Sequence, residues 1–122
     1  MKSMLIVRLA VAGLFGLLVT GIAAAQNNYS TTFVGITNLV FYSANDSVYP
    51  QYAGAAVVNF ATPVIWAFGG PCATGTVAIR SNDKSLMTAV ETAQATGRPI
   101  QVFVDDSQTV DGVVCWLRAV EM

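Results

Sequence analysis

The first 25 residues constrain the fold most, because their pattern is that of a segment removed before folding. Lys2 and Arg8 precede an apolar run over residues 9–22, and three alanines ending at Ala25 follow it. A basic start, a short apolar run and small residues at its exit predict a secretory signal peptide, residues 1–25, cleaved after Ala25. A membrane anchor is the alternative. However, a spanning helix needs roughly 20 apolar residues, and residues 9–25 fall short while including three glycines.

Removal of this segment leaves residues 26–122, which suffice for one domain. The 54% hydrophobic share of the full chain is raised by the leader. The remainder carries four basic and seven acidic side chains, a formal charge of −3. Such a domain lacks the basic surface that binds nucleic acid or anionic lipid. We therefore expect an exported domain, periplasmic or secreted and most consistent with a bacterial envelope, with no nucleic-acid partner and no membrane attachment after cleavage.

Both cysteines of the chain, Cys72 and Cys115, lie in this domain. An even pair in an oxidising compartment predicts one disulfide. A reactive or metal-binding thiol is the alternative, but the sequence has no histidine and no third cysteine to support it. Because the bond closes a long loop in a small domain, it should supply a large share of the stability.

Strand-forming residues dominate the first half of the domain. Residues 26–32 are polar and predict a loose lead-in. Runs rich in β-branched and aromatic residues follow, separated by clusters of Ser, Asn, Asp, Gly and Pro. They predict a first strand over 32–42, with a bulge or bend at Gly35, and a second over 55–60, which Thr62-Pro63 interrupts before an apolar run resumes over 64–68. A turn at 69–71 and a third strand over 76–80 follow.

The second half predicts a helix and a hairpin. Apolar residues at i, i+3, i+4 and i+7 predict a helix over 83–96 that Gly97 ends. Alternation predicts strands over 100–104 and 113–120, with the acidic stretch between them as the turn. On the last strand Val113, Cys115 and Leu117 share one face, which places the disulfide on the core side.

The order of three strands, one helix and two strands predicts a mainly β fold. It is the order of an OB-like five-stranded barrel, in which the helix lies between the third and fourth strands. An open antiparallel α+β sheet with one covering helix is the alternative.

The run CATGTVAIRSNDKSLMTAVETAQATGRPIQVFVDDS, Cys72–Ser107, resembles in layout the B subunits of subtilase-cytotoxin-type bacterial toxins. It looks still more like small exported bacterial proteins of unestablished role, which share C-x-x-G-T-V-A-I-R, a helix, G-x-P-I/V, V-x-V-D-D-S and a late cysteine. The resemblance covers Cys72 to Arg118. It implies an OB-fold, secretion and a ring of five glycan-binding subunits. The sialic-acid-binding residues of the toxin subunits have no placed counterpart over 32–68, so no residue role is carried over.

No residue pattern in the domain points to catalysis. Without histidine, the usual Ser-His-Asp and Cys-His systems are absent. Asp105, Asp106 and Asp111 form one acidic cluster, which could serve as a cation site or a carboxylate pair. Asp-Asp-Ser and Asp-Gly are also ordinary turn sequences, and we favour that interpretation. We predict no enzyme activity, no catalytic residue, no cofactor and no metal.

Aromatic residues are the remaining candidates for function. Tyr49 and Tyr52 flank Pro50 in a loop and are candidate ligand-binding residues, as is Trp66. Aromatic side chains also fill cores, and core packing is favoured for Trp66 and Phe68.

Phe103 and Trp116 are candidate interface residues, because Trp116 lies on the strand face opposite Cys115 and an uncovered apolar face suits a subunit contact. The sequence thus predicts an exported, non-enzymatic binding or assembly module with a glycan or protein partner, or a homo-oligomer. A periplasmic structural or interaction protein is the alternative.

Overall fold

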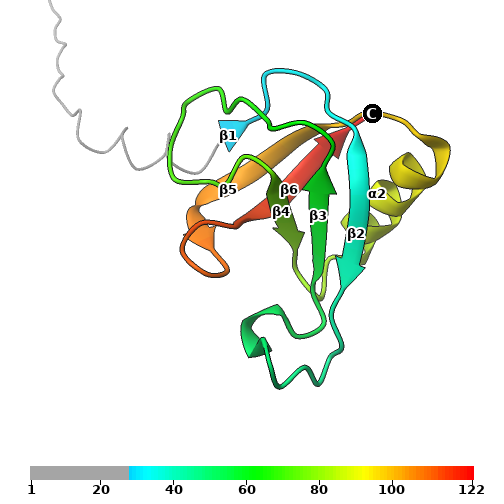
Figure 1. Ribbon diagram of the computed structural model, residues 1–122, viewed down its shortest axis with the longest axis vertical. Coiled ribbons are helices and arrows are strands. Elements are labelled where there is room, and N and C mark those ends of the chain that lie inside the picture. Colours follow the sequence, from blue (N-terminus) through cyan, green and yellow to red (C-terminus); the bar gives the residue numbers. More distant parts are fainter. Residues whose placement is uncertain (1–27) are drawn as a thin grey trace, which may run out of the picture.

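The β-branched and aromatic runs form a six-stranded sheet, and the computed structural model in Figure 1 describes residues 28–122. The predicted signal peptide, residues 1–25, lies outside the described residues. The strands are β1 (Asn28–Tyr29), β2 (Ile36–Phe41), β3 (Ala56–Phe60), β4 (Thr76–Ile79), β5 (Gln101–Thr109) and β6 (Cys115–Glu121), with the α-helix α2 (Lys84–Thr96) and the short 3-10 helix η1 (Pro50–Tyr52).

The strand order in the sheet is β1-β5-β6-β4-β3-β2. Neighbouring strands are antiparallel except β4 and β6, which are parallel and pair at Ala78 and Trp116. The parallel pair arises because α2 carries the chain past the sheet, so that β5 forms beyond β6 and the chain then returns beside β4. Within residues 28–122 the mainly β fold with one α-helix is confirmed. The sheet is mixed and not closed into a five-stranded barrel, and it also differs from the purely antiparallel alternative.

Several strand boundaries differ from the predicted ones. The lead-in contains β1, and the strand predicted from residue 32 begins at Ile36. Residues 64–68 form a loop that touches the sheet through one bridge between Ser30 and Trp66. β5 extends to Thr109, so the turn predicted from Asp105 begins later. Asp105 instead pairs with Trp116 across the sheet, and the irregular register that follows it accommodates the polar stretch.

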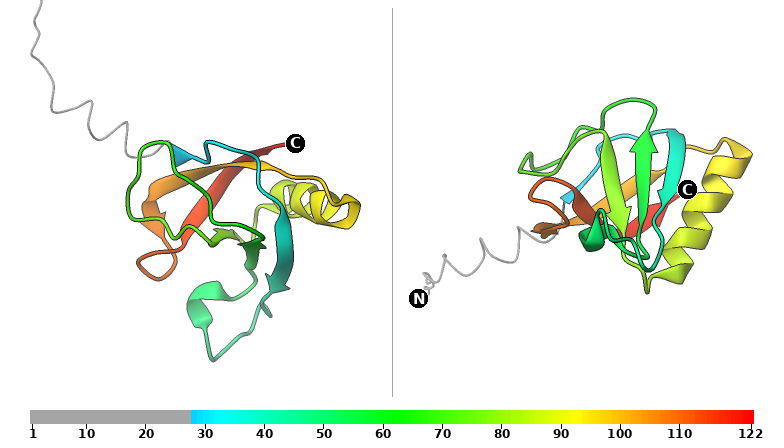
Figure 2. Two further views of the ribbon diagram at one scale, coloured as in Figure 1. Left: turned by 45° about the horizontal axis from the view of Figure 1, so that its top comes forward. Right: turned by 60° about the horizontal axis from the view of Figure 1, so that its bottom comes forward.

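The end of the helix and its buried face follow their sequence signals, whereas Asp83 at its start makes no side-chain capping hydrogen bond. Gly97 adopts φ 67°, a left-handed conformation that favours glycine and ends α2. Val90 and Ala93 of the predicted apolar stripe are buried against the core. Figure 2 shows α2 lying alongside β2. Among residues 28–122 no helix is both long and apolar enough to cross a membrane.

The disulfide lies in the main core. Cys72 and Cys115 are joined with their Cα atoms 5.4 Å apart, and both are buried. Leu117 is buried beside them, as the alternation on the last strand predicts. Val113 is 52% exposed and does not share that face, because it lies in the turn before β6 begins.

Candidate functional site

A long loop between β2 and β3, residues 43–54, carries two of the predicted ligand-binding tyrosines, and we call it the tyrosine loop. Its base is closed by two hydrogen bonds of 2.9 Å, from Tyr42 N to the Ala55 carbonyl and from Gly54 N to the Ser43 carbonyl. One oxygen of Asp46 accepts hydrogen bonds from the backbone N–H groups of Val48 (3.0 Å) and Tyr49 (2.6 Å). Local bonds of this kind give the loop a defined shape.

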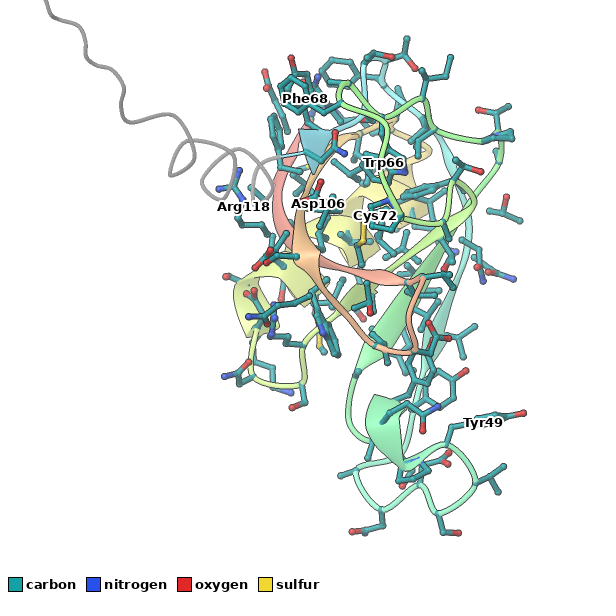
Figure 3. The ribbon with its side chains drawn as sticks, turned by 90° about the vertical axis from the view of Figure 1, so that its left-hand side faces the viewer. Tyr49, Trp66, Phe68, Cys72, Asp106 and Arg118 are labelled. Carbon is teal, nitrogen blue, oxygen red and sulfur yellow. A yellow bond between two sulfur atoms is a disulfide. The ribbon has the colours of Figure 1, made fainter. Side chains whose placement is uncertain are left out.

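Three tyrosines pack together at this loop: Tyr52 is buried, Tyr42 is half-buried and Tyr49 is exposed. The rings of Tyr42 and Tyr52 are stacked with centroids 5.0 Å apart, and Tyr49 meets Tyr42 edge-on at 6.3 Å. Tyr52 is 8% exposed, whereas Tyr49 is 51% exposed. Figure 3 shows Tyr49 at one end of the molecule. Tyr52 therefore supports the loop, and Tyr49 offers its ring to solvent.

Asp111 connects the tyrosine loop to the hairpin turn between β5 and β6. The Tyr52 hydroxyl donates a hydrogen bond of 2.8 Å to one Asp111 oxygen. The other oxygen accepts from the backbone N–H groups of Val114 (3.1 Å) and Val113 (3.3 Å). The Asp111 carboxylate thus stabilises the β5–β6 turn and also holds the tyrosine loop in place through Tyr52.

These contacts shift the pKa values of both partners. Burial, and then the hydrogen bond to Asp111, raise the pKa of Tyr52 to about 12. Burial opposes ionisation of Asp111, but the hydrogen bonds from Tyr52, Val114 and Val113 outweigh it and lower the pKa of Asp111 below 3.8. Both shifts favour a neutral phenol beside an ionised carboxylate.

Tyr52→Phe is expected to lower the free energy of unfolding by about 1 kcal/mol, a modest value because Asp111 is exposed to water. The difference from wild type should stay constant between about pH 4 and about pH 10. It should shrink in acid, as pH falls through the lowered pKa of Asp111, and in base, as pH rises from 10.0 towards about 12. Urea unfolding of both proteins across this range measures it. If the difference in free energy of unfolding is largest outside this pH range, the hydrogen bond between Tyr52 and Asp111 is not its cause.

Trp66 and Phe68, both expected to pack in the core, have opposite environments. Trp66 is 7% exposed, and its ring N–H donates to the Ala73 carbonyl at 3.2 Å, so core packing is confirmed for it. Phe68 is 65% exposed, so core packing is wrong for it. Gly69, with φ 64°, begins an exposed turn directly after Phe68. Figure 3 shows Phe68 at the far end of the molecule from Tyr49.

The two predicted interface residues make separate contacts. Trp116 is half-buried and packs in a second apolar cluster with Tyr52, Ala78 and Val114. The Arg80 guanidinium lies over its ring, 4.8 Å from the centroid, and donates a 2.7 Å hydrogen bond to Gln108. The ring of Phe103 instead packs against the ring of Tyr29, with their centroids 5.8 Å apart. Trp116 is thus partly covered by its own chain.

The three residues of the predicted acidic cluster accept hydrogen bonds from different partners. Asp105 accepts hydrogen bonds from Ser107, including its hydroxyl at 2.6 Å, and Asp106 accepts from Asn28. Asp111 binds Tyr52. Within residues 28–122 no group of three or more His, Cys, Asp or Glu side chains is placed to hold a metal ion.

Asn28, in the polar lead-in, is a key residue that sequence reasoning missed. Its side chain is fully buried and makes four hydrogen bonds. The amide nitrogen donates to the Gly69 carbonyl (2.6 Å) and to Asp106 (3.2 Å), and the amide oxygen accepts from Phe68 N (3.1 Å) and Tyr29 N (3.0 Å). A polar stretch carries no apolar pattern, so only these long-range partners identify it as interior.

Comparison of the chain with protein-family models, with curated proteins and with solved structures gave no match in any of the three.

Proposed function

We propose that residues 26–122 form an exported, non-enzymatic binding module, and that the tyrosine loop and the adjoining turn at residues 110–114 bind a glycan. The observation that carries the proposal is the half-exposed Tyr49 ring, which packs edge-on against the stacked rings of Tyr42 and Tyr52, with Tyr52 bonded to Asp111. An aromatic ring held in place before binding loses little conformational entropy when a ligand stacks on it. The predicted leader and the disulfide support export, since disulfides persist in oxidising compartments.

We further propose that the sheet is an OB-like arrangement. Val34, between β1 and β2, exchanges two backbone hydrogen bonds with Ile100 at the start of β5, of 2.7 and 2.8 Å. This bridge links the segment just before β2, at one edge of the sheet order, with the start of β5, the second strand from the other edge. The helix between β4 and β5 and the parallel β4–β6 pair also support the proposal.

An OB-like arrangement favours this particular site. OB-folds bind oligosaccharides and oligonucleotides on one sheet face and on the loops between strands 1 and 2 and between strands 4 and 5. In the proposed correspondence these are the tyrosine loop and the β5–β6 turn, which touch through Tyr52 and Asp111. The two loops therefore form one surface.

The chemistry of the tyrosine loop favours a saccharide over a nucleic acid. The loop contains Asp46 and no lysine or arginine, so it has nothing to neutralise phosphates. Asn45, Ser47 and Gln51 are exposed in the same loop as Tyr49 and can donate and accept hydrogen bonds. An aromatic face next to neutral polar groups matches a sugar ring, which has an apolar face and hydroxyl groups.

Tyr49→Ala is expected to weaken glycan binding at least about tenfold, because the stacking surface is lost. A glycan array with the mature protein identifies the ligand, and titration calorimetry then measures wild type and variant. Phe33→Ala is the matched control, since Phe33 is an aromatic residue of similar exposure, 47% against 51% for Tyr49, and lies outside both loops. It should bind as wild type does. Silence across the array, or equal binding by Tyr49→Ala, contradicts the proposal.

A further inference from the structure

Asp106 of β5 has a buried carboxylate oxygen without a partner. Its Oδ2 accepts a 3.2 Å hydrogen bond from the amide nitrogen of Asn28, at the start of β1 (Figure 3). Gly70 covers this contact so closely that a Cβ atom there would lie 3.6 Å from both bonded atoms. The other oxygen, Oδ1, is buried and has no hydrogen-bond partner among residues 28–122. Because burial of a carboxylate oxygen without a donor is costly, we expect a further donor at Asp106.

The pairing of β1 with β5 directs the beginning of the domain to this carboxylate. Asn28 pairs with Val104 in an antiparallel ladder. In such a ladder, two residues backward on one strand correspond to two residues forward on the other. Continued in this way, the register brings residue 26 opposite Asp106. Asn28 and Asp106 already contact each other as diagonal neighbours on one face of the ladder, so Asp106 keeps the orientation that the register requires.

The same register directs the backbone nitrogen of residue 26 towards β5. Ser30 N donates a 2.9 Å hydrogen bond to the Val102 carbonyl, which marks these two residues as a hydrogen-bonded pair. Such pairs recur at every second residue of an antiparallel ladder, with their Cα atoms about 5.5 Å apart. Residues 26 and 106 belong to this series. The nitrogen of residue 26 is thereby aimed at the Asp106 backbone, next to the unpartnered carboxylate.

We infer that the α-ammonium group of Gln26, created when the leader is removed, binds the Asp106 carboxylate. The inference rests on the proposed export, with cleavage after Ala25. Hydrolysis of the Ala25–Gln26 peptide bond by water leaves a carboxylate on the leader and an amino group on Gln26, which takes up a proton at neutral pH. This ammonium has three N–H groups and a positive charge, so it bonds both the Asp106 carbonyl and Oδ1. In the uncleaved chain the same nitrogen is a neutral amide with one N–H group.

Leader removal thus stabilises the domain through a contact that the precursor lacks. A charged donor is a stronger partner for a buried carboxylate than a neutral amide is. The precursor is therefore less stable than the mature domain, which suits a chain that folds after export. The contact takes no part in glycan binding, because Tyr49 lies well away from Asp106 (Figure 3).

Urea unfolding of three forms of the mature domain tests the inference, at about pH 6.5, where an α-amino group with a pKa of about 8 is charged. One form begins at Gln26, and a second retains Ala25, which moves the charge by one residue. In the third, the α-amine of Gln26 has attacked its own side-chain amide carbon with release of ammonia, which removes the charge at the same length. The second and third forms should have folding equilibrium constants at least about tenfold lower than the first.

Asp106→Asn shows whether this difference comes from the carboxylate. The variant keeps an oxygen acceptor but has no charge, and in it the three forms should differ by less than about twofold. Asp105→Asn is the matched control, because the neighbouring Asp105 carboxylate accepts from Ser107 instead. In Asp105→Asn the tenfold difference should remain. Near-ultraviolet circular dichroism checks that both variants keep the fold.

The rate of acetylation of the Gln26 α-amine gives a second measurement that does not depend on unfolding. Lys84, the only lysine of residues 26–122, is exposed and serves as the internal reference. A paired α-ammonium loses its proton less readily, so acetylation relative to Lys84 should be at least about threefold slower in wild type than in Asp106→Asn. Peptide mass spectrometry measures both rates.

Equal stability of the three forms overturns the inference, as does a loss in Asp106→Asn as large as in wild type, or an equal relative rate of acetylation. The intact mass of the product exported from the full-length gene tests the proposed cleavage separately. A first residue other than Gln26 contradicts the cleavage site and this inference together. Equal stability with Gln26 as the first residue contradicts this inference alone, and glycan binding is decided by the array in either case.

Discussion

Loss of the disulfide between Cys72 and Cys115 is expected to lower the free energy of unfolding by about 4 kcal/mol. The two residues are 43 positions apart, and the bond restricts the unfolded chain over that whole loop. A domain of this size has a total stability of roughly 5 to 10 kcal/mol, so the reduced protein should be close to unfolding at 37 °C. Urea unfolding of the oxidised and reduced proteins measures the difference.

The chain provides its own control, because it contains only these two cysteines. A variant with both replaced by alanine should unfold like the reduced wild type and should not respond to reductant. Alanine is the suitable replacement, since both sites are buried and a serine hydroxyl would lack a partner there. If the oxidised and reduced proteins differ by less than about 1 kcal/mol, the loop-restriction argument fails for this domain.

Asn28→Ala is expected to lower the free energy of unfolding by about 2 to 4 kcal/mol. The substitution removes a fully buried side chain and leaves the Gly69 carbonyl and the Phe68 N–H without their side-chain partner, in contacts that are themselves part-buried. Asn45→Ala is the matched control on an exposed asparagine, and it should change stability by less than about 0.5 kcal/mol. Chemical denaturation of both variants decides the prediction, and equal effects would contradict the interior role of Asn28.

Asn28→Asp provides a second test of the same contact. The Asn28 amide nitrogen lies 3.2 Å from an Asp106 oxygen, so an aspartate at this site places two carboxylates together. This variant should be less stable at pH 7 than at about pH 4, because protonation of one carboxylate removes the repulsion. A pH-independent loss would show that Asp106 is not part of the contact.

Local signals account for the parts of the fold that were predicted correctly. The helix needs only the apolar stripe through Val90 and Ala93 and the stop at Gly97. The burial of Cys115 and Leu117 follows from alternation along one strand. Each signal lies within a few residues of the feature it predicts.

The features that were missed depend on partners far along the chain. β1 is two residues long and polar, and it exists because Asn28 and Ser30 find hydrogen bonds from residues near 68 and 102. The exposure of Phe68 depends on that same contact. Strand alternation alone also does not specify that β6 lies parallel to β4, since this depends on where the chain returns after α2.

The candidate site was predicted only in part. The loop position of Tyr49 and Tyr52 follows from the turn-forming residues around Pro50. Their different roles do not, because Tyr52 packs against Ala78 and Val114 and bonds Asp111, 59 positions later in the chain. Trp66 lies in the same aromatic-rich half, but its position in the core is set by the bridge to Ser30. Aromatic composition identifies the candidates, and long-range contacts decide which of them face solvent.

The pairing of β1 with β5 sets the order in which this domain can fold. Asn28 pairs with Val104, so the first described strand has its partner near the end of the chain. A polypeptide that emerges amino end first, from a ribosome or through a membrane, cannot complete this pairing until residue 104 has followed. Until then Tyr29 lacks Phe103, and Asn28 lacks Asp106. Because β6, which pairs with both β4 and β5, emerges later still, only the antiparallel β2–β3–β4 part of the sheet can form before the helix and the last two strands have followed.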